Sequence, residues 1–265
     1  MRRRERAAAA VLGRIPPRLR DSTKERIARA IGLPWDELAR RDVDVAGLAD
    51  LDAGTRAILE RVRRYTVTPP DRIAAMCGAV DYLVDHAVPG AFVECGVWKG
   101  GSLMACALRL LERGDTDREL VAFDTFDGGT DPSAEDVDYR GVAQVPQGPG
   151  AQLPIDADLA SVTANLHSTG YPPERIRLEA GDVMKTVPAA APAQIALLRL
   201  DTDWYDSTQH ELEHLYARLA VGGVLLIDDY GHYAGARKAT DEFFAGKRIF
   251  LQRIDYTARI AVKQA

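Results

Sequence analysis

Acidic side chains recur directly after short apolar runs of this chain. Residues 195–200 are almost wholly apolar and precede Asp201, and residues 224–227 precede Asp228 and Asp229. Carboxylates held close together repel one another, which raises their pKa values, and a divalent cation relieves that repulsion. All-oxygen ligation suits Mg²⁺, with Ca²⁺ or Mn²⁺ as alternatives. We therefore expect these three aspartates to bind a metal ion; the alternative is that they cap a segment and start a turn.

The segment after Asp201 supplies a candidate base. Asp203 follows two residues later, within reach of a substrate hydroxyl at the metal. Metal coordination lowers the pKa of a bound oxygen, so that a nearby carboxylate can accept its proton. We expect Asp203, or Asp201 itself, to be catalytic. The alternative bases are His232, just after the acid pair, and His167.

A second group of candidate residues surrounds the glycine-rich run at residues 96–102. An apolar run ending in Glu94 and Cys95 precedes it, and a helical pattern follows it. Strand, glycine turn and helix in this order form the first unit of a nucleotide-type site, where glycines let the backbone approach a ligand and Ser102 can cap the helix or touch the ligand. Plain packing, of the turn and of Trp98, is the alternative. The residues expected to bind a nucleoside-containing cofactor are Glu94, Gly96, Trp98, Gly100, Ser102, Asp124 and Asp182.

These side chains need a sheet that brings them to one edge. Five apolar runs, at residues 91–95, 120–124, 175–180, 195–200 and 224–227, alternate with helical patterns. Such alternation predicts an α/β fold with a mainly parallel, doubly wound sheet, whose ligands bind beyond the carboxyl ends of the strands. Residues 249–254 and 259–262 resemble a final hairpin. The expected helices are residues 51–62, 71–86, 103–111, 155–169, 207–219 and 236–244.

Two segments lie outside this alternation. Residues 1–65 are highly charged and helical in pattern, so we expect an N-terminal helical extension to a catalytic domain at residues 66–265. Residues from about 128 to 154 are rich in Gly, Pro, Asp and Gln and lack periodicity, which predicts a lid loop with Tyr139 as an acceptor contact. A disordered insertion without a role is the alternative for this loop.

Composition narrows the partners. The chain has 265 residues and a net charge of −5, and no basic excess favours nucleic acid or an anionic membrane as its main partner. No apolar run approaches the ~20 residues of a membrane span. The three cysteines lie in apolar patterns, which indicates buried free thiols in a reducing, cytoplasmic compartment. We also expect a homo-oligomer, for which the charged N-terminal helices are candidate contacts.

Four longer motifs carry a resemblance to a known family. The pattern Glu-x-Gly-x-Trp-x-Gly-x-Ser at residues 94–102 resembles the cofactor motif of metal-dependent, catechol-type O-methyltransferases. The macrocin O-methyltransferase (TylF-type) family is a more specific match, over about residues 62–264. Its motifs resemble Val-Glu-Cys-Gly-Val-Trp-Lys-Gly-Gly at residues 93–101, Asp-Thr-Phe-Asp-Gly at 124–128, Leu-Arg-Leu-Asp-Thr-Asp-Trp-Tyr-Asp-Ser-Thr at 198–208 and Asp-Asp-Tyr-Gly at 228–231.

The resemblance implies a fold and an activity. The implied fold is a Rossmann-like class I methyltransferase with a mainly parallel seven-stranded sheet and a C-terminal antiparallel hairpin. S-adenosylmethionine and Mg²⁺ are the implied cofactors. The implied acceptor is a deoxysugar hydroxyl on a macrolide or another glycosylated secondary metabolite. The family's metal ligands match Asp201, Asp228 and Asp229, and residues 65–68 resemble the segment that closes over cofactor and acceptor, which adds Thr66 to the cofactor contacts and Tyr65 to the acceptor contacts.

One departure from the catechol enzymes bears on the acceptor. Those enzymes place a lysine base three residues after the first metal ligand, where this chain has Trp204. That difference favours an aliphatic sugar hydroxyl, with a catechol or phenol as the alternative. A Mg²⁺-dependent phosphatase is an alternative of another class, but its two aspartates must lie two apart, whereas Asp124 and Asp127 are three apart. A non-catalytic cofactor-binding subunit is the last alternative, and the intact acid triad argues against it.

Overall fold

The computed structural model describes residues 50–144 and 157–265, so the helices expected before residue 50 and the second half of the expected lid loop lie outside the described residues. The chain divides into two compact units, Met1–Asp50 and Leu51–Ala265. Helix α4 (Ala53–Val62), which falls within the expected N-terminal extension, packs against α5 (Pro70–Asp85) and α6 (Gly101–Arg113) inside the larger unit.

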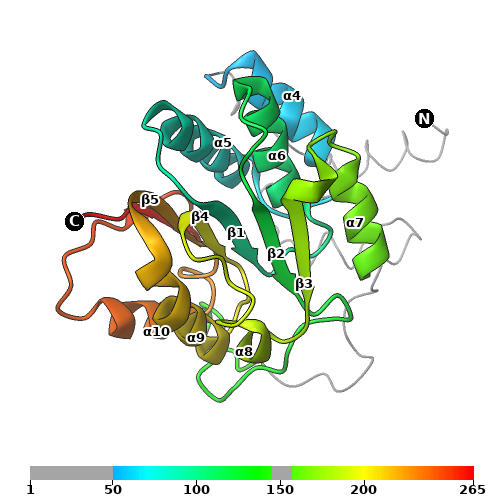
Figure 1. Ribbon diagram of the computed structural model, residues 1–265. Coiled ribbons are helices and arrows are strands. Elements are labelled where there is room, and N and C mark those ends of the chain that lie inside the picture. Colours follow the sequence, from blue (N-terminus) through cyan, green and yellow to red (C-terminus); the bar gives the residue numbers. More distant parts are fainter. Residues whose placement is uncertain (1–49, 145–156) are drawn as a thin grey trace, which may run out of the picture. The chain divides into compact units, whose positions relative to one another are not determined.

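A seven-stranded sheet forms the centre of the larger unit, as the family resemblance implies. Its strand order is β3-β2-β1-β4-β5-β7-β6 (Figure 1). The first five strands in sequence pair in parallel, whereas β7 pairs antiparallel with both β5 and β6 and so forms the expected C-terminal hairpin. The strands are β1 (Ala91–Cys95), β2 (Leu120–Asp124), β3 (Ile176–Ala180), β4 (Ile195–Leu200), β5 (Leu219–Ile227), β6 (Gln252–Arg253) and β7 (Arg259–Val262).

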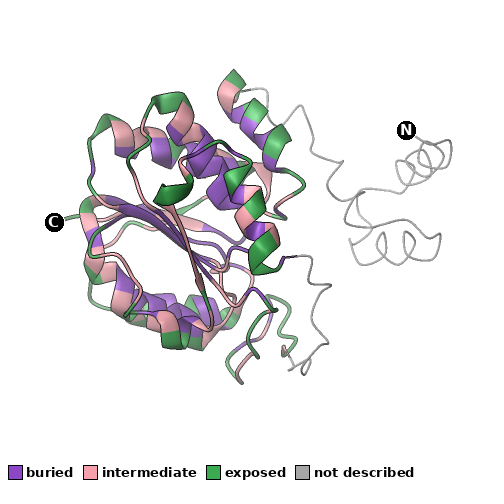
Figure 2. Cartoon of the chain, turned by 45° about the vertical axis from the view of Figure 1, so that its right-hand side comes forward, coloured by how far each residue is buried: buried purple, intermediate pink, exposed green. Residues whose placement is uncertain are grey.

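Helices cover both faces of the sheet. Helices α4, α5, α6 and α7 (Leu159–His167) lie on one face, and α8 (Val183–Thr186), α9 (Tyr205–Leu215) and α10 (Ala234–Phe244) lie on the other (Figure 1). All residues of β1 and β4 are buried, because parallel strands covered on both faces need apolar side chains in both directions. Figure 2 shows this burial running along the sheet and the inner sides of the helices. The three cysteines are free and buried, as expected.

Strands β1 and β4 are neighbours, although two other strands separate them in sequence. The chain runs from β1 outward to β3 and then returns to β4 and runs outward on the opposite side. Loops after adjacent strands part at such a switch point, which leaves a crevice at the carboxyl ends where ligands of doubly wound sheets bind. The residues after β1, β2, β4 and β5 therefore lie at the same edge of the sheet.

The expected boundary between α9 and β5 is wrong. Helix α9 ends at Leu215, followed by a short 3-10 turn, and β5 begins at Leu219 rather than at residue 224. Gly222 and Gly223 do not close a helix; they form an irregularity within β5, where the register to β4 shifts between Ile195 and Leu197. Gly222 has φ of 82°, and a side chain at Gly223 would lie 3.0 Å from the carbonyl oxygen of Ala196, so both positions require glycine.

The start of α6 also differs from expectation. The helix begins at Gly101 instead of residue 103, and its N-cap is Gly100, which has φ of 83°. Ser102 therefore does not cap the helix; it lies buried inside the first turn. The short helix α8 follows β3 without having been expected, and Asp182 caps it by accepting the N–H of Met184 at 3.0 Å. In the described parts of the chain, no helix is both long and apolar enough to cross a membrane.

Candidate active site

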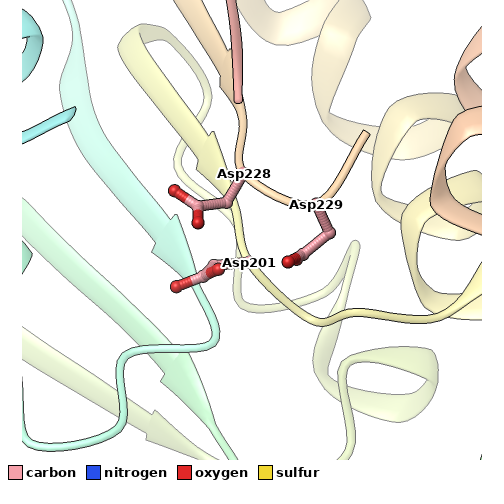
Figure 3. A group of neighbouring side chains, drawn as sticks. All are labelled: Asp201, Asp228 and Asp229. Atoms are coloured by element: carbon pink, nitrogen blue, oxygen red, sulfur yellow. The ribbon is translucent and has the colours of Figure 1, made fainter. Parts of the chain in front are cut away.

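Three carboxylates gather where β4 and β5 end. Asp201 follows β4, and Asp228 and Asp229 follow β5; one carboxylate oxygen from each lies within 4.8 Å of the others (Figure 3). The cause is the parallel pairing of the two strands, in which Leu200 is level with Ile227 and the N–H of Asp228 donates to the carbonyl of Leu200 at 2.9 Å. The structure thus brings together the three residues that the sequence predicts as metal ligands.

The three carboxylates of this acid cluster repel one another. Burial, followed by the negative charges of neighbouring aspartates, raises the pKa of Asp201 and of Asp229 well above the ordinary range. Oxygen ligands at this spacing are what Mg²⁺ and Ca²⁺ take in proteins, and a bound cation would reverse both pKa shifts. The donor set therefore fits a hard divalent cation.

Two arginines that sequence reasoning missed hold the cluster together. Arg199, within β4, is 1% exposed, and its guanidinium lies 2.7 Å from Asp201 and 2.6 Å from Asp228 and also pairs with Glu94. Arg72, on α5, pairs with Asp228 and donates to Asp255 at 2.7 Å. A signal for Arg199 existed, since it is the one charge in the apolar run at residues 195–200; Arg72 carried none.

Glu94 is paired inside the protein. It is 1% exposed, one carboxylate oxygen contacts Arg199, and the other, Oε2, is buried without a hydrogen-bond partner. Burial raises the pKa of Glu94 to about 7, against the opposing effect of Arg199. The acid that ends β1 is thereby connected through one guanidinium to the acids that follow β4 and β5.

Asp203 lies among the same acids on a constrained turn. The N–H of Trp204 donates to the carbonyl of Thr202 at 2.8 Å, which leaves Asp203 at the centre of a three-residue turn with φ of 68°. A left-handed non-glycine residue in such a turn is strained, and strain of this kind clusters at functional sites. Burial, with the negative charges of Asp201 and Asp228, raises the pKa of Asp203 to about 8.

A buried glutamate holds this turn by a hydrogen bond. Glu211, on α9, is fully buried, and its carboxylate accepts the hydroxyl of Thr202 at 3.0 Å. Burial raises the pKa of Glu211 to about 8. No sequence pattern distinguished this residue from the other charges of α9.

The glycine turn is fitted against the chain's own backbone. A side chain at Gly96 would lie 2.0 Å from the carbonyl oxygen of Asp201, and one at Gly101 would lie 2.5 Å from that of Tyr65. The N–H of Gly101 donates to the Tyr65 carbonyl at 3.0 Å. Packing therefore accounts for glycine at these two positions, and it locks the turn to the acid cluster on one side and to residues 65–66 on the other.

Asp124 also serves the backbone of this turn. Its carboxylate accepts the N–H groups of Val97 at 2.7 Å, Trp98 at 3.0 Å and Phe126 at 3.0 Å. Asp124 nevertheless lines a pocket beyond the carboxyl ends of the strands, with Gly96, Gly181 and Thr202 among the other lining residues. Asp182 lies next to that pocket with its carboxylate engaged as the cap of α8.

The segment at residues 65–68 joins the buried polar groups. The hydroxyl of Thr66 accepts the N–H of Thr68 at 2.9 Å, and the Thr68 hydroxyl lies 3.2 Å from that of Ser102. Arg199 donates to the Thr68 hydroxyl at 3.2 Å. Thr66 and Ser102 are buried and Tyr65 is half-buried.

The remaining candidates divide. Tyr139 is exposed at the tip of a turn, with its ring 5.4 Å from that of His232, close to the acid cluster. Burial lowers the pKa of His232, which leaves its ring neutral at pH 7. His167, the other alternative base, is the exposed last residue of α7 on the opposite helical layer. The structure thus keeps Asp203 and His232 near the acids and leaves His167 away from them.

Comparisons with known proteins agree with this architecture. The chain is 34% identical over 175 residues to 8-demethyl-8-(2,3-dimethoxy-alpha-L-rhamnosyl)-tetracenomycin-C 4'-O-methyltransferase from Streptomyces olivaceus, covering 63% of this chain and 62% of the relative. It is 31% identical over 169 residues to mycinamicin III 3''-O-methyltransferase from Micromonospora griseorubida, covering 63% of this chain and 65% of the relative. The chain therefore spans less than two thirds of the length of these relatives.

A solved structure and a family model extend the likeness. The structure of the O-methyltransferase NovP superposes with a TM-score of 0.67 at 25% sequence identity, over 76% of this chain and 83% of that one. The macrocin-O-methyltransferase (TylF) family model matches residues 41–262, a range that contains the glycine turn, both arginines and the whole acid cluster. With its strand order, its switch-point site and all four sequence motifs inside that match, the chain belongs to the macrocin-O-methyltransferase (TylF) family.

Proposed function

We propose that this protein is an S-adenosylmethionine- and Mg²⁺-dependent O-methyltransferase that methylates a sugar hydroxyl of a glycosylated secondary metabolite. The observation that carries the proposal is the acid cluster of Asp201, Asp228 and Asp229, held at the switch point beside the glycine turn. Family membership supports the transfer of a methyl group to oxygen. The names of the two relatives, a rhamnosyl-tetracenomycin and a mycinamicin O-methyltransferase, support a glycosylated antibiotic as the acceptor.

S-adenosylmethionine would supply an electrophilic methyl group to the pocket beyond β1, β2 and β4. Asp124 lines that pocket and would contact the ribose of the cofactor. Backbone N–H groups fix the orientation of its carboxylate. Glu94 would act on the site indirectly, through its ion pair with Arg199, which lies between Glu94 and the acid cluster. The other proposed cofactor contacts are Thr66, Gly96, Trp98, Gly100, Ser102 and Asp182.

A divalent cation at the acid cluster would neutralise its charge and lower the pKa of an acceptor hydroxyl nearby. The cation would also lower the raised pKa of Asp203, whose turn holds it among the three ligands. The Asp203 carboxylate would then accept the hydroxyl proton. Asp201 is the alternative acceptor of that proton. Tyr65 and Tyr139 would contact the acceptor, and orienting it can supply roughly 7–11 kcal/mol of the rate acceleration.

Calorimetric titration with S-adenosylhomocysteine, with Mg²⁺ and then with EDTA, tests the cofactor and the metal separately. We expect binding in both conditions, and turnover of a glycosylated acceptor only with Mg²⁺. Binding that vanishes with EDTA would move the metal from the acceptor to the cofactor. No binding in either condition would contradict the methyltransferase assignment.

The alternatives make different demands on the same residues. For a catechol acceptor, the lysine position holds Trp204, whose indole N–H donates to the carbonyl of Thr130 at 2.8 Å and cannot act as a base. For a phosphatase, Asp124 would have to be a free nucleophile, yet three backbone N–H groups occupy its carboxylate. We expect no hydrolysis of a generic phosphate ester and higher turnover of glycosides than of catechols.

A further inference from the structure

Three aromatic side chains from distant parts of the chain meet beside the acid cluster. The ring of Tyr139 lies 5.4 Å from that of His232 and 6.2 Å from that of Tyr256, and the His232 and Tyr256 rings are 5.9 Å apart. Nδ1 of His232 is 3.1 Å from the Tyr256 hydroxyl. We call these three residues the aromatic wall. Tyr139 is 61% exposed and Tyr256 is 53% exposed, so the wall presents large ring surfaces to solvent.

A buried aspartate builds the turn that displays Tyr139. Asp138 is 3% exposed, its carboxylate accepts the N–H groups of Arg140 at 2.8 Å and Val142 at 3.0 Å, and its carbonyl accepts the N–H of Gly141 at 2.8 Å. Tyr139 thus lies at the tip of a tight turn. A β-bridge between Asp138 and Tyr233 anchors the turn to the start of α10. The position of Tyr139 is therefore set by hydrogen bonds rather than by a loose loop.

A second aspartate builds the turn that displays Tyr256. Asp255 accepts the N–H groups of Thr257 and Ala258, each at 2.8 Å, with one carboxylate oxygen, and Arg72 at 2.7 Å with the other. The turn rests on Gly231, where a side chain would lie 1.8 Å from the carbonyl oxygen of Tyr256. Both exposed tyrosines are thereby held on rigid supports, as a binding surface requires.

The wall is continuous with the acid cluster. Arg72 bridges Asp228 to Asp255, the residue before Tyr256, and the N–H of His232 donates to the carbonyl of Asp229 at 2.9 Å. A molecule whose hydroxyl reaches the acids would extend its next ring over the wall. Exposed aromatic surface beside a catalytic site is the usual lining for the apolar part of a ligand.

Two arginines near His232 are paired with carboxylates. They are Arg140 and Arg72, and, besides burial, their positive charges lower the pKa of His232. Arg72 is bound to Asp228 and Asp255, and Arg140 donates to Asp138 at 2.7 Å and covers the Tyr139 ring at 5.5 Å. Two further arginines, Arg253 and Arg259, donate to backbone carbonyls of the turn that displays Tyr256. The selectivity of the wall is therefore expected from its ring surfaces.

We propose that the aromatic wall binds a planar aromatic aglycone of the glycoside whose sugar hydroxyl is methylated. Aromatic rings attract flat partners through offset-stacked and edge-to-face contacts, which a flexible aliphatic ring or chain does not reproduce. The inference rests on the proposed function and narrows it from any glycosylated metabolite to one with a planar aromatic ring system next to the sugar.

Two glycosides of the same sugar test the wall. We choose 4-methylumbelliferyl and cyclohexyl α-L-rhamnopyranoside and measure each dissociation constant by calorimetry with Mg²⁺ and S-adenosylhomocysteine present. The wild-type protein should bind the aromatic glycoside about 2- to 10-fold more tightly, the range of aromatic pair interactions. Tyr139→Ala and Tyr256→Ala should each reduce that ratio toward one, whereas Tyr256→Phe should keep it.

Controls separate the wall from the proposed function. Phe250→Ala removes another exposed aromatic side chain, 76% exposed, and should leave the ratio unchanged. Equal affinity for the two glycosides, no binding of either by a protein that binds S-adenosylhomocysteine, or a ratio unaffected by the tyrosine variants would overturn the wall alone. Absence of S-adenosylhomocysteine binding by the wild-type protein would instead overturn the proposed function.

Discussion

The glycine turn and the acid cluster occupy the same edge of the sheet but satisfy their polar groups differently. In the glycine turn, the Asp124 carboxylate accepts three backbone N–H groups, and Gly96 and Gly101 meet backbone carbonyls. In the acid cluster, carboxylates meet guanidinium groups and one another, and the pKa values of Asp201 and Asp229 are raised. The polar groups of the glycine turn are satisfied by the chain itself, and we call this turn the frame. In the acid cluster, the carboxylates still repel one another, and a cation would relieve that repulsion.

Both regions are nevertheless connected. Arg199 joins Glu94 at the end of β1 to Asp201 and Asp228, and Gly96 touches the backbone of Asp201. A change in the frame should therefore alter folding, whereas a change in the metal ligands should alter turnover. The following variants break or sharpen that contrast, in order of decreasing effect.

Removal of the shared guanidinium should have the largest effect. Arg199→Met removes the buried guanidinium that three carboxylates share, although Asp228 keeps Arg72, and breaking a buried ion pair costs roughly 3–5 kcal/mol. We expect the free energy of unfolding to fall by that amount in urea denaturation. Arg113→Met, at a half-exposed ion pair between α6 and α5, is the matched control and should change stability by less than about 1 kcal/mol. Equal effects of the two variants would mean that Arg199 does not hold the regions together.

A metal-ligand variant should affect turnover instead. Asp229→Asn keeps the shape of the side chain and removes one negative charge from the cluster, so the turnover rate should fall by at least ~100-fold. The dissociation constant of S-adenosylhomocysteine, measured by calorimetry, should stay within about twofold of the wild-type value, because the glycine turn is complete without the metal. Asp206→Asn, at an exposed acid on α9, should leave both quantities unchanged. Retention of turnover in Asp229→Asn would refute the metal role.

A frame variant should act on stability. Gly96→Ala places a Cβ 2.0 Å from the Asp201 carbonyl oxygen at a φ of 79°, so we expect a loss of about 1–3 kcal/mol in the free energy of unfolding. Gly78→Ala is the matched control, since nothing lies within 4 Å of its Cβ position in α5, and the better helix propensity of alanine should slightly stabilise the protein. If Gly96→Ala were as stable as the control, the close fit of the turn to residue 201 would be wrong.

The buried glutamate predicts the smallest effect per unit of pH, a pH dependence of stability. Burial raises the pKa of Glu211 from 4.5 to about 8 in the folded protein, so between these values the folded state binds a proton that the unfolded state has released. Stability should therefore fall as pH rises from about 5 to 8, by up to ~1.4 kcal/mol per pH unit. The Glu211→Gln variant should lose less stability than wild type over this range in urea titrations.

A matched variant checks that this slope belongs to burial. Glu213→Gln alters an exposed carboxylate on the same helix and should keep the wild-type pH dependence. Parallel curves for wild type and Glu211→Gln would show that the Glu211 carboxyl titrates in its ordinary range.

Features that depend on neighbouring residues were predicted from the sequence, whereas features that depend on contacts between distant residues were missed. Strands β1, β2 and β4 were predicted to the residue, because burial on both faces demands continuous apolar runs. The start of β5 was missed because glycines can end a helix or form an irregularity in a strand, and pairing with β4 decides between the two. Arg72 and Asp255, 183 positions apart, carry no local pattern that would connect them.

The sequence by itself determined that acids follow β4 and β5 and that a glycine turn follows β1, since parallel strands put their carboxyl ends at one edge whatever the loops do. Only the tertiary structure decided what those groups meet. It turned Asp124 toward backbone N–H groups, inserted Arg199 among three carboxylates, and brought Tyr139, His232 and Tyr256 together. The physical reason is that pairing of charges and rings depends on distances across the fold, which no spacing along the chain encodes.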